Sequence, residues 1–108
     1  MSTDYCVIYC TCPNRETAEN LSALLLEKRL VACLNIVPHL SSHYIWQGKI
    51  TKGEELLLVM KTKTSKLTQV EGLILEVHPY EFPEFIAMPI IYGNRQYLDW
   101  VNEVVDEE

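Results

Sequence analysis

Three cysteines near the start of the chain have a spacing that can bring sulfur atoms together. Cys6, Cys10 and Cys12 are separated by even numbers of residues, so a straight strand points all three side chains to the same face. Two close thiols can bind a soft metal such as Cu(I). The alternative is structural, because free cysteine is among the most buried residue types and packs as a small apolar side chain. Cys33 lies in the apolar run 31–34, where burial is again the alternative.

A second group of candidate ligands lies in segment 78–84, which combines two prolines with His78, Tyr80, Glu81 and Glu84. Imidazole nitrogen and carboxylate oxygen are donors suited to Cu(II), zinc and similar ions. Binding residues also concentrate on connectors held by a rigid scaffold. The competing interpretation is a stiff connector whose prolines fix the path of the chain into the next strand.

The overall charge argues against nucleic acid as a partner. Lys plus Arg is 9 and Asp plus Glu is 15, for a net charge of −6, and a net-acidic surface repels a polyanion. No apolar run approaches the length of a membrane span, so no membrane partner is expected. With no recognisable signal peptide and no disulfide-scaffold spacing, we expect a cytoplasmic protein with reduced thiols.

Enzyme motifs are missing from the chain. There is no glycine-rich phosphate loop, no nucleophile elbow and no HExxH motif, and each of these would place catalytic groups in a known geometry. The sequence therefore favours a protein that is not an enzyme.

The elements that must position these residues follow from apolar periodicity. The expected strands are rich in β-branched and aromatic residues and lie at 5–12, 32–46, 54–62 and 84–92. The expected helices have apolar residues at helical spacing and lie at 14–30, at 64–78 and near 97–104. In the last helix the apolar face is expected to comprise Tyr97, Trp100, Val101 and Val104. Pro38 and Pro89 fall inside expected strands, where proline indicates a bulge or an edge.

The order β-α-β-β-α-β with a terminal helix predicts one domain over residues 1–108. Its fold class is α+β, a ferredoxin-like two-layer sandwich with both main helices on one face of an antiparallel sheet. Residues 56–60 and 85–91 are apolar at almost every position, so these strands are apolar on both faces. Strands of this kind are normally covered on both sides, and the helices cover only one side. We therefore expect self-association through the other side.

Several segments, taken in order, resemble the divalent-cation tolerance family, CutA. They are residues 11–13, 27–35, 44–50, 61–62, 78–84 and 93–100. The resemblance implies a ferredoxin-like subunit in a homotrimer, a link to copper tolerance, Cu(II) binding and no established enzyme activity. By position, Cys10, Cys33 and His78 match cysteine and histidine residues associated with copper in bacterial members. Some members carry a second histidine just before this one, where the present chain has Val77.

Two functional hypotheses follow. The first is a homotrimer that binds Cu²⁺ through Cys10, Cys33 and His78, and other divalent cations more weakly. The second is a trimer that binds a small ligand or a protein partner, resembling the PII-like signalling proteins of similar architecture. Its cleft candidates are Tyr80, Glu81, Glu84 and Lys61.

Overall fold

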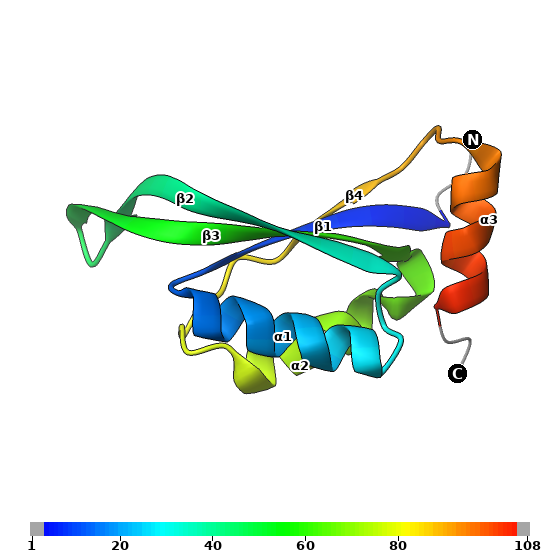
Figure 1. Ribbon diagram of the computed structural model, residues 1–108. Coiled ribbons are helices and arrows are strands. Elements are labelled where there is room, and N and C mark those ends of the chain that lie inside the picture. The colour runs from blue at the N-terminus through cyan, green and yellow to red at the C-terminus, as the bar shows by residue number, and fades with distance from the viewer. Residues whose placement is uncertain (1–3, 106–108) are drawn as a thin grey trace.

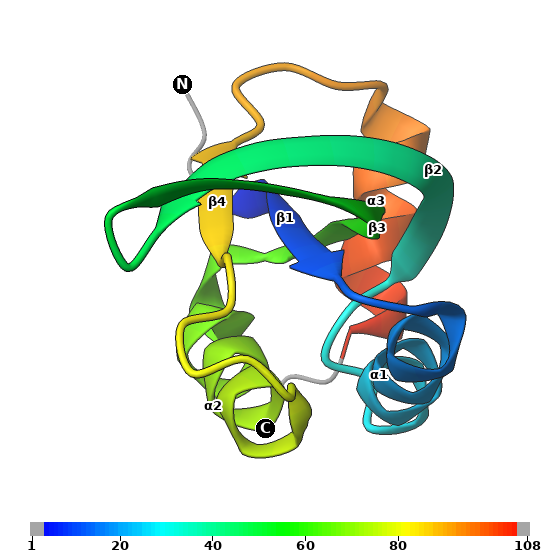
Figure 2. The same ribbon diagram turned by 90° about the vertical axis from the view of Figure 1, so that its left-hand side faces the viewer.

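The computed structural model describes residues 4–105 and places both long helices on one face of a sheet of four antiparallel strands (Figures 1 and 2). The strands are β1 (Tyr5–Cys12), β2 (Cys33–Trp46), β3 (Lys49–Lys63) and β4 (Ile86–Pro89), in the order β2-β3-β1-β4. The helices are α1 (Arg15–Glu27), α2 (Leu67–Val77) and α3 (Arg95–Val104), with a 3-10 turn η1 (Thr64–Lys66) before α2. The predicted α+β ferredoxin-like arrangement is confirmed.

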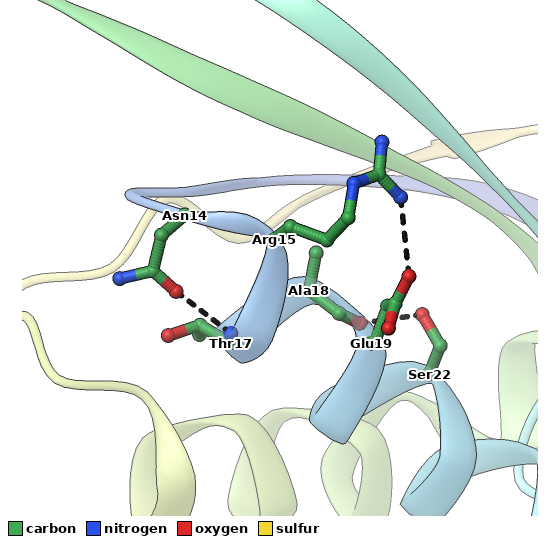
Figure 3. A network of polar contacts seen from close by, with 6 residues as sticks. All are labelled: Asn14, Arg15, Thr17, Ala18, Glu19 and Ser22. Carbon is green, nitrogen blue, oxygen red and sulfur yellow. Dashed lines mark hydrogen bonds and ion pairs between the residues drawn. The ribbon is translucent and has the colours of Figure 1, made fainter.

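Helix α1 begins where its sequence provides a cap. The side-chain oxygen of Asn14 accepts a hydrogen bond from the Thr17 amide at 2.8 Å, and Arg15 pairs with Glu19 one turn later at 3.3 Å (Figure 3). An N-cap of this kind satisfies an amide that would otherwise have no partner. The prediction of Asn14 as the cap is confirmed.

Helix α1 ends at Glu27 rather than at residues 29–30 as predicted. Arg29 takes a left-handed φ of 56° and donates its amide to Leu26, while the Leu30 amide reaches back to Leu25. These two backbone bonds are those of a Schellman motif, which closes a helix without extending it. The apolar periodicity continues through Leu30, so the sequence predicted the end of the helix two to three residues too late.

The core lies between the helical layer and one face of the sheet. Alternation along β1 turns Ile8 and Cys10 toward the helices, where both are fully buried, and β3 contributes Leu58 and Met60. Helices α1 and α2 bury matching apolar residues such as Leu21 and Ile74 against them. This packing turns the face of β1 that carries the cysteines toward the helices.

Strands β2 and β3 form a long hairpin that extends beyond the helices, at the left of Figure 1. Its two-residue turn uses Gln47 and Gly48, both with positive φ, as a type I′ turn requires. The register shifts between Val37 and Leu40, which confirms the irregularity expected at Pro38. Strand β3 starts at Lys49 rather than at residue 54, because cross-strand pairing rather than apolar content keeps the polar part of the hairpin extended.

The last strand is shorter than the predicted 84–92. Strand β4 covers only Ile86–Pro89, at the edge of the sheet beside β1. An edge position tolerates Pro89 because a proline has no amide to donate. The prediction of an edge or bulge for this proline is therefore confirmed.

Helix α3 stands across one end of the sheet in Figure 1. It buries Leu98 and Val101, with Val105 just beyond its end, whereas Tyr97 and Trp100 are 38% and 40% exposed. Of the four residues predicted for the buried face of this helix, only Val101 is buried. The residues that face inward each lie one position after Tyr97, Trp100 and Val104. None of the helices in residues 4–105 is long and apolar enough to span a membrane.

The sheet face opposite α1 and α2 is apolar and open. Cross-strand pairing aligns Tyr9 with Ile86 and with Val59, and Val7 with Met88. Ile86 is 48% exposed and Met88 37%. We call this surface, formed by Val7, Tyr9, Val37, Leu57, Val59, Ile86 and Met88, the open sheet face. The strands are thus apolar on both faces as predicted.

Candidate metal centre

Cys10, Cys12 and His78 form a compact group of possible metal ligands. Their donor atoms all lie within 4.8 Å of one another and all three residues are buried. Among the residues that the structure describes, this is the one group of three or more such ligands. We call it the thiol–imidazole cluster.

Strand parity explains the two sulfurs. Cys10 and Cys12 lie on the same face of β1, opposite Leu58 and Leu56 of β3, and both have no solvent exposure. This face is the one covered by the helices. The thiols are therefore held in the dry layer between sheet and helices.

The end of α2 brings the imidazole to the same place. His78 is the C-cap of the helix, with ψ at 137°, and its amide still donates to Ile74 at 2.8 Å. The following Pro79 forces this extended conformation, since a residue before proline avoids the helical region. The side chain can then turn back toward β1 and reach the carbonyl of Thr11. The helix thus ends at His78, as predicted.

Two hydrogen bonds fix the ring of His78. Its Nε2 lies 2.8 Å from the carbonyl oxygen of Thr11, and its Nδ1 lies 3.1 Å from the amide of Tyr80. A carbonyl only accepts and an amide only donates, so Nε2 carries the proton and Nδ1 accepts. The ring lone pair that an ion would need is therefore at Nδ1, and binding an ion there requires the ring to release the Tyr80 amide.

The connector is anchored a second time through Tyr80. Its hydroxyl donates to Glu55 Oε2 at 2.7 Å, and its ring lies 4.8 Å from that of His78. Burial, followed by the carboxylate of Glu55, raises the pKa of the Tyr80 hydroxyl well above its usual range. Glu55 is itself 8% exposed. The Tyr80 hydroxyl therefore keeps the proton that it donates to Glu55 at neutral pH.

The two thiols influence each other directly. A hydrogen bond between them raises the pKa of Cys10, and burial and the carboxylates of Glu84 and Glu55 raise it further. The same bond lowers the pKa of Cys12, although burial opposes the effect. The thiolate thus forms first at Cys12, with the Cys10 thiol donating to it. An arrangement of two sulfurs and one imidazole, with carboxylates nearby, suits a soft or borderline cation.

The remaining predicted ligand, Cys33, lies elsewhere. It pairs with Lys61 toward the opposite end of β3, and its sulfur is 3.2 Å from the hydroxyl of Tyr97 on α3. The structure thus brings Cys10 and His78 together and leaves Cys33 outside the group. In its place stands Cys12, whose shared parity with Cys10 was visible in the sequence.

The predicted cleft residues are also dispersed. Tyr80 contacts the cluster through His78, and Glu84 is close enough for its charge to affect Cys10. Glu81 is exposed, and Lys61 donates to Asn35 on the neighbouring strand. Glu55, the partner of Tyr80, was not predicted, because nothing in a local pattern marks a strand carboxylate as buried.

Comparison with known proteins identifies the family. The family model described as CutA1 divalent ion tolerance protein matches residues 6–104. The chain belongs to the CutA1 divalent ion tolerance family. This confirms the resemblance inferred from the sequence.

Relatives in the CutA1 family come from distant organisms. A divalent-cation tolerance protein CutA of Thermus thermophilus is 45% identical over 97 residues, which are 90% of this chain and 94% of the relative. The human protein CutA is 41% identical over 98 residues, 91% of this chain but only 55% of the relative. The chain therefore spans nearly the whole bacterial relative and about half of the human one.

Solved CutA1 structures superpose closely on this chain. The Cut A1 structure from Thermus thermophilus gives a TM-score of 0.92 at 43% identity and covers 94% of this chain and 99% of that chain. The CutA1 structure from Oryza sativa gives 0.94 at 38% identity and covers 99% of this chain and 100% of that chain. The fold of the family is thus shared across the described residues.

Proposed function

We propose that the chain is a homotrimeric divalent-cation tolerance protein that binds Cu(II), contributes to copper tolerance and is not an enzyme. The observation that carries the proposal is the thiol–imidazole cluster, with its donor atoms within 4.8 Å of one another. Family membership supplies the link to divalent cations. Copper stands near the top of the divalent affinity order, so other divalent cations are expected to bind more weakly.

Self-association is supported by the open sheet face. Monomers rarely leave a continuous apolar surface uncovered, and here Tyr9 and Ile86 stand side by side on it, half exposed. The resemblance to CutA proteins favours three copies as the closed arrangement. Free thiols at four positions also agree with a cytoplasmic location, which we propose as part of this function.

Calorimetric titration of the full chain with Cu(II) tests the metal-binding part. We expect saturable binding that weakens at least about tenfold in His78→Gln, since loss of even an indirect metal partner costs about 10–100-fold. His43→Gln is the matched control, because His43 is exposed on the hairpin and its ring contacts Ser41. Absence of saturable Cu(II) binding to the unaltered chain would contradict the proposal.

The structure gives less support to the alternative of a small anionic ligand. A hollow of about 370 Å³ lies between the start of α1 and the hairpin, and its lining includes the basic residues Arg15 and His39 together with the acidic residues Glu54 and Glu55. Such mixed charge does not favour an anion. Lys61 and Lys63 donate to Asn35 and Asn102 instead, outside this hollow.

A further inference from the structure

We propose that Cys10 and Cys12 hold copper in its monovalent state, as a two-sulfur site to which His78 adds a ring nitrogen. This inference rests on the proposed copper function, names the ligands of the cluster, and adds the reduced ion, Cu(I), to the Cu(II) binding proposed above. It replaces Cys33 by Cys12 in the ligand set. Its basis is the position, burial and present partners of the two thiols.

The thiols are already placed to share one ion. Ligand atoms bonded to a single ion at about 2.0–2.3 Å stand about 3.5–4.5 Å apart, and the cluster atoms lie within 4.8 Å of one another. Apart from the other thiol, the Cys10 sulfur has a long contact of 3.8 Å to the Thr11 carbonyl. Little existing bonding must therefore be broken at sulfur to admit a cation.

The position of Cys6 shows that burial alone does not make the site. Cys6 lies on the same face of β1 and is 3% exposed, and it belongs to the same apolar core. It is four residues from Cys10 and is not part of the cluster. Proximity to a second thiol and to His78 thus distinguishes Cys10 and Cys12 from an ordinary core cysteine.

The dryness of the cluster favours the monovalent ion. Cys10 and Cys12 have no exposed surface and His78 has 6%, so the cluster offers three donors and little access for water. Zinc normally completes four ligands, and hard divalent ions need several oxygens or waters. Cu(I) prefers soft sulfur and is satisfied by two or three ligands. Three buried donors match its requirement.

Binding is a simple exchange of ions. One Cu⁺ enters, two S–H bonds break, two Cu–S bonds form and two protons leave to solvent, with no change in the oxidation state of copper or sulfur. The His78 ring gives up the bond that Nδ1 accepts from the Tyr80 amide, so that the Nδ1 lone pair can bind Cu⁺, and it keeps the bond that Nε2 donates to the Thr11 carbonyl. The remaining bond orients the ring, as outer partners do for histidine ligands in metalloproteins.

Anaerobic competition with a coloured Cu(I) chelator tests the proposal on the full chain. We expect one Cu⁺ per chain, and a loss of affinity of at least about a hundredfold in Cys10→Ala and in Cys12→Ala, because removing a direct ligand should exceed the 10–100-fold cost of losing an outer one. Cys6→Ala and Cys33→Ala are matched controls. Each removes a thiol outside the cluster and is expected to leave Cu⁺ affinity unchanged.

X-ray absorption of the unaltered, Cu⁺-loaded chain gives a second test that does not depend on variants folding. We expect a monovalent edge and two sulfur neighbours. Nitrogen and oxygen neighbours alone, or full Cu⁺ affinity in the Cys10→Ala/Cys12→Ala double variant, would overturn the proposal. If Cu(II) binds in a His78-dependent manner and Cu⁺ does not bind, this inference fails while the proposed function stands. If neither ion binds, the proposed function itself fails.

Discussion

His78 joins three parts of the chain through its backbone and its ring. Its amide closes α2, its Nε2 donates to the carbonyl of Thr11 at the end of β1, and its Nδ1 accepts from Tyr80 in the connector. Tyr80 then continues to Glu55 on β3. A metal ion at the cluster would replace one of these ring bonds, so occupancy of the site and the path of segment 78–84 are physically linked.

Tyr97 provides a prediction on pH dependence. Burial, followed by the hydrogen bond to Cys33, raises the pKa of Tyr97 to about 12, compared with about 10 in an unfolded chain. Between these values the unfolded state has lost the proton and the folded state retains it, so stability falls as pH rises through this window. Urea unfolding should show a smaller loss between pH 10 and 12 in Tyr97→Phe than in the unaltered chain.

Comparing Tyr97→Phe with the unaltered chain isolates the titration of Tyr97, because the other tyrosines are common to both proteins. Equal losses of unfolding free energy in the two chains across pH 10 to 12 would contradict the prediction. Below pH 9 the difference between them should be constant, since Tyr97 is then protonated in both folded and unfolded states.

The sequence predicted the site only in part. Parity along β1 was sufficient to place Cys10 and Cys12 on one face, and the proline after His78 was sufficient to end α2 there. Position-by-position resemblance selected Cys33 instead of Cys12. Which second thiol lies beside Cys10 and His78 depends on where β2 joins the sheet and where the end of α2 meets β1, and neither is encoded in local spacing.

At the scale of the elements, the Asn14 cap should have a measurable effect. In Asn14→Ala the amide of Thr17 loses its side-chain acceptor, so we expect the free energy of unfolding to fall by about 1 kcal/mol. Urea denaturation measures this. Asn20→Ala is the control, since Asn20 is exposed on the middle of the same helix. A similar loss in both variants would show that the cap contributes nothing special.

The hairpin turn allows backbone strain to be tested separately from side-chain packing. Gly48 has φ at +79° and nothing within 4 Å of an added Cβ, whereas Gly53 has equal space and no positive φ. We expect Gly48→Ala to lower the unfolding free energy by about 1–2 kcal/mol, the cost of a left-handed non-glycine residue. Gly53→Ala should cause no comparable loss. Equal effects in thermal and urea unfolding would refute this explanation of the turn.

The elements themselves were largely predictable, and the errors have physical causes. Each predicted strand and helix is present in the structure. The errors occur where another force sets the boundary: backbone bonding at Arg29 ends α1, cross-strand pairing extends β3 back to Lys49, and β4 pairs over only four residues. Apolar periodicity does not register these interactions.

At the scale of the whole molecule, the two faces of the sheet have different roles. One face packs on α1 and α2 and holds the thiol–imidazole cluster, while the other presents the open sheet face. β1 contributes to both: Cys10 and Cys12 point to one side and Tyr9 to the other. Assembly through the open face would stiffen the strand that carries the ligands without covering the cluster itself.

The assembly prediction is that Ile86→Glu separates the subunits. Ile86 lies on the edge strand opposite Tyr9 and is 48% exposed, so a charge there would be buried unpaired in any contact made by this face, at considerable cost. Light scattering after gel filtration should give three times the 12.5 kDa chain for the unaltered protein, and a lower mass for the variant. Leu75→Glu is the matched control, because Leu75 is a 56% exposed apolar residue on α2, away from the sheet. A stable, folded monomer of the unaltered chain, or equal dissociation of both variants, would show that the open sheet face is not the contact surface.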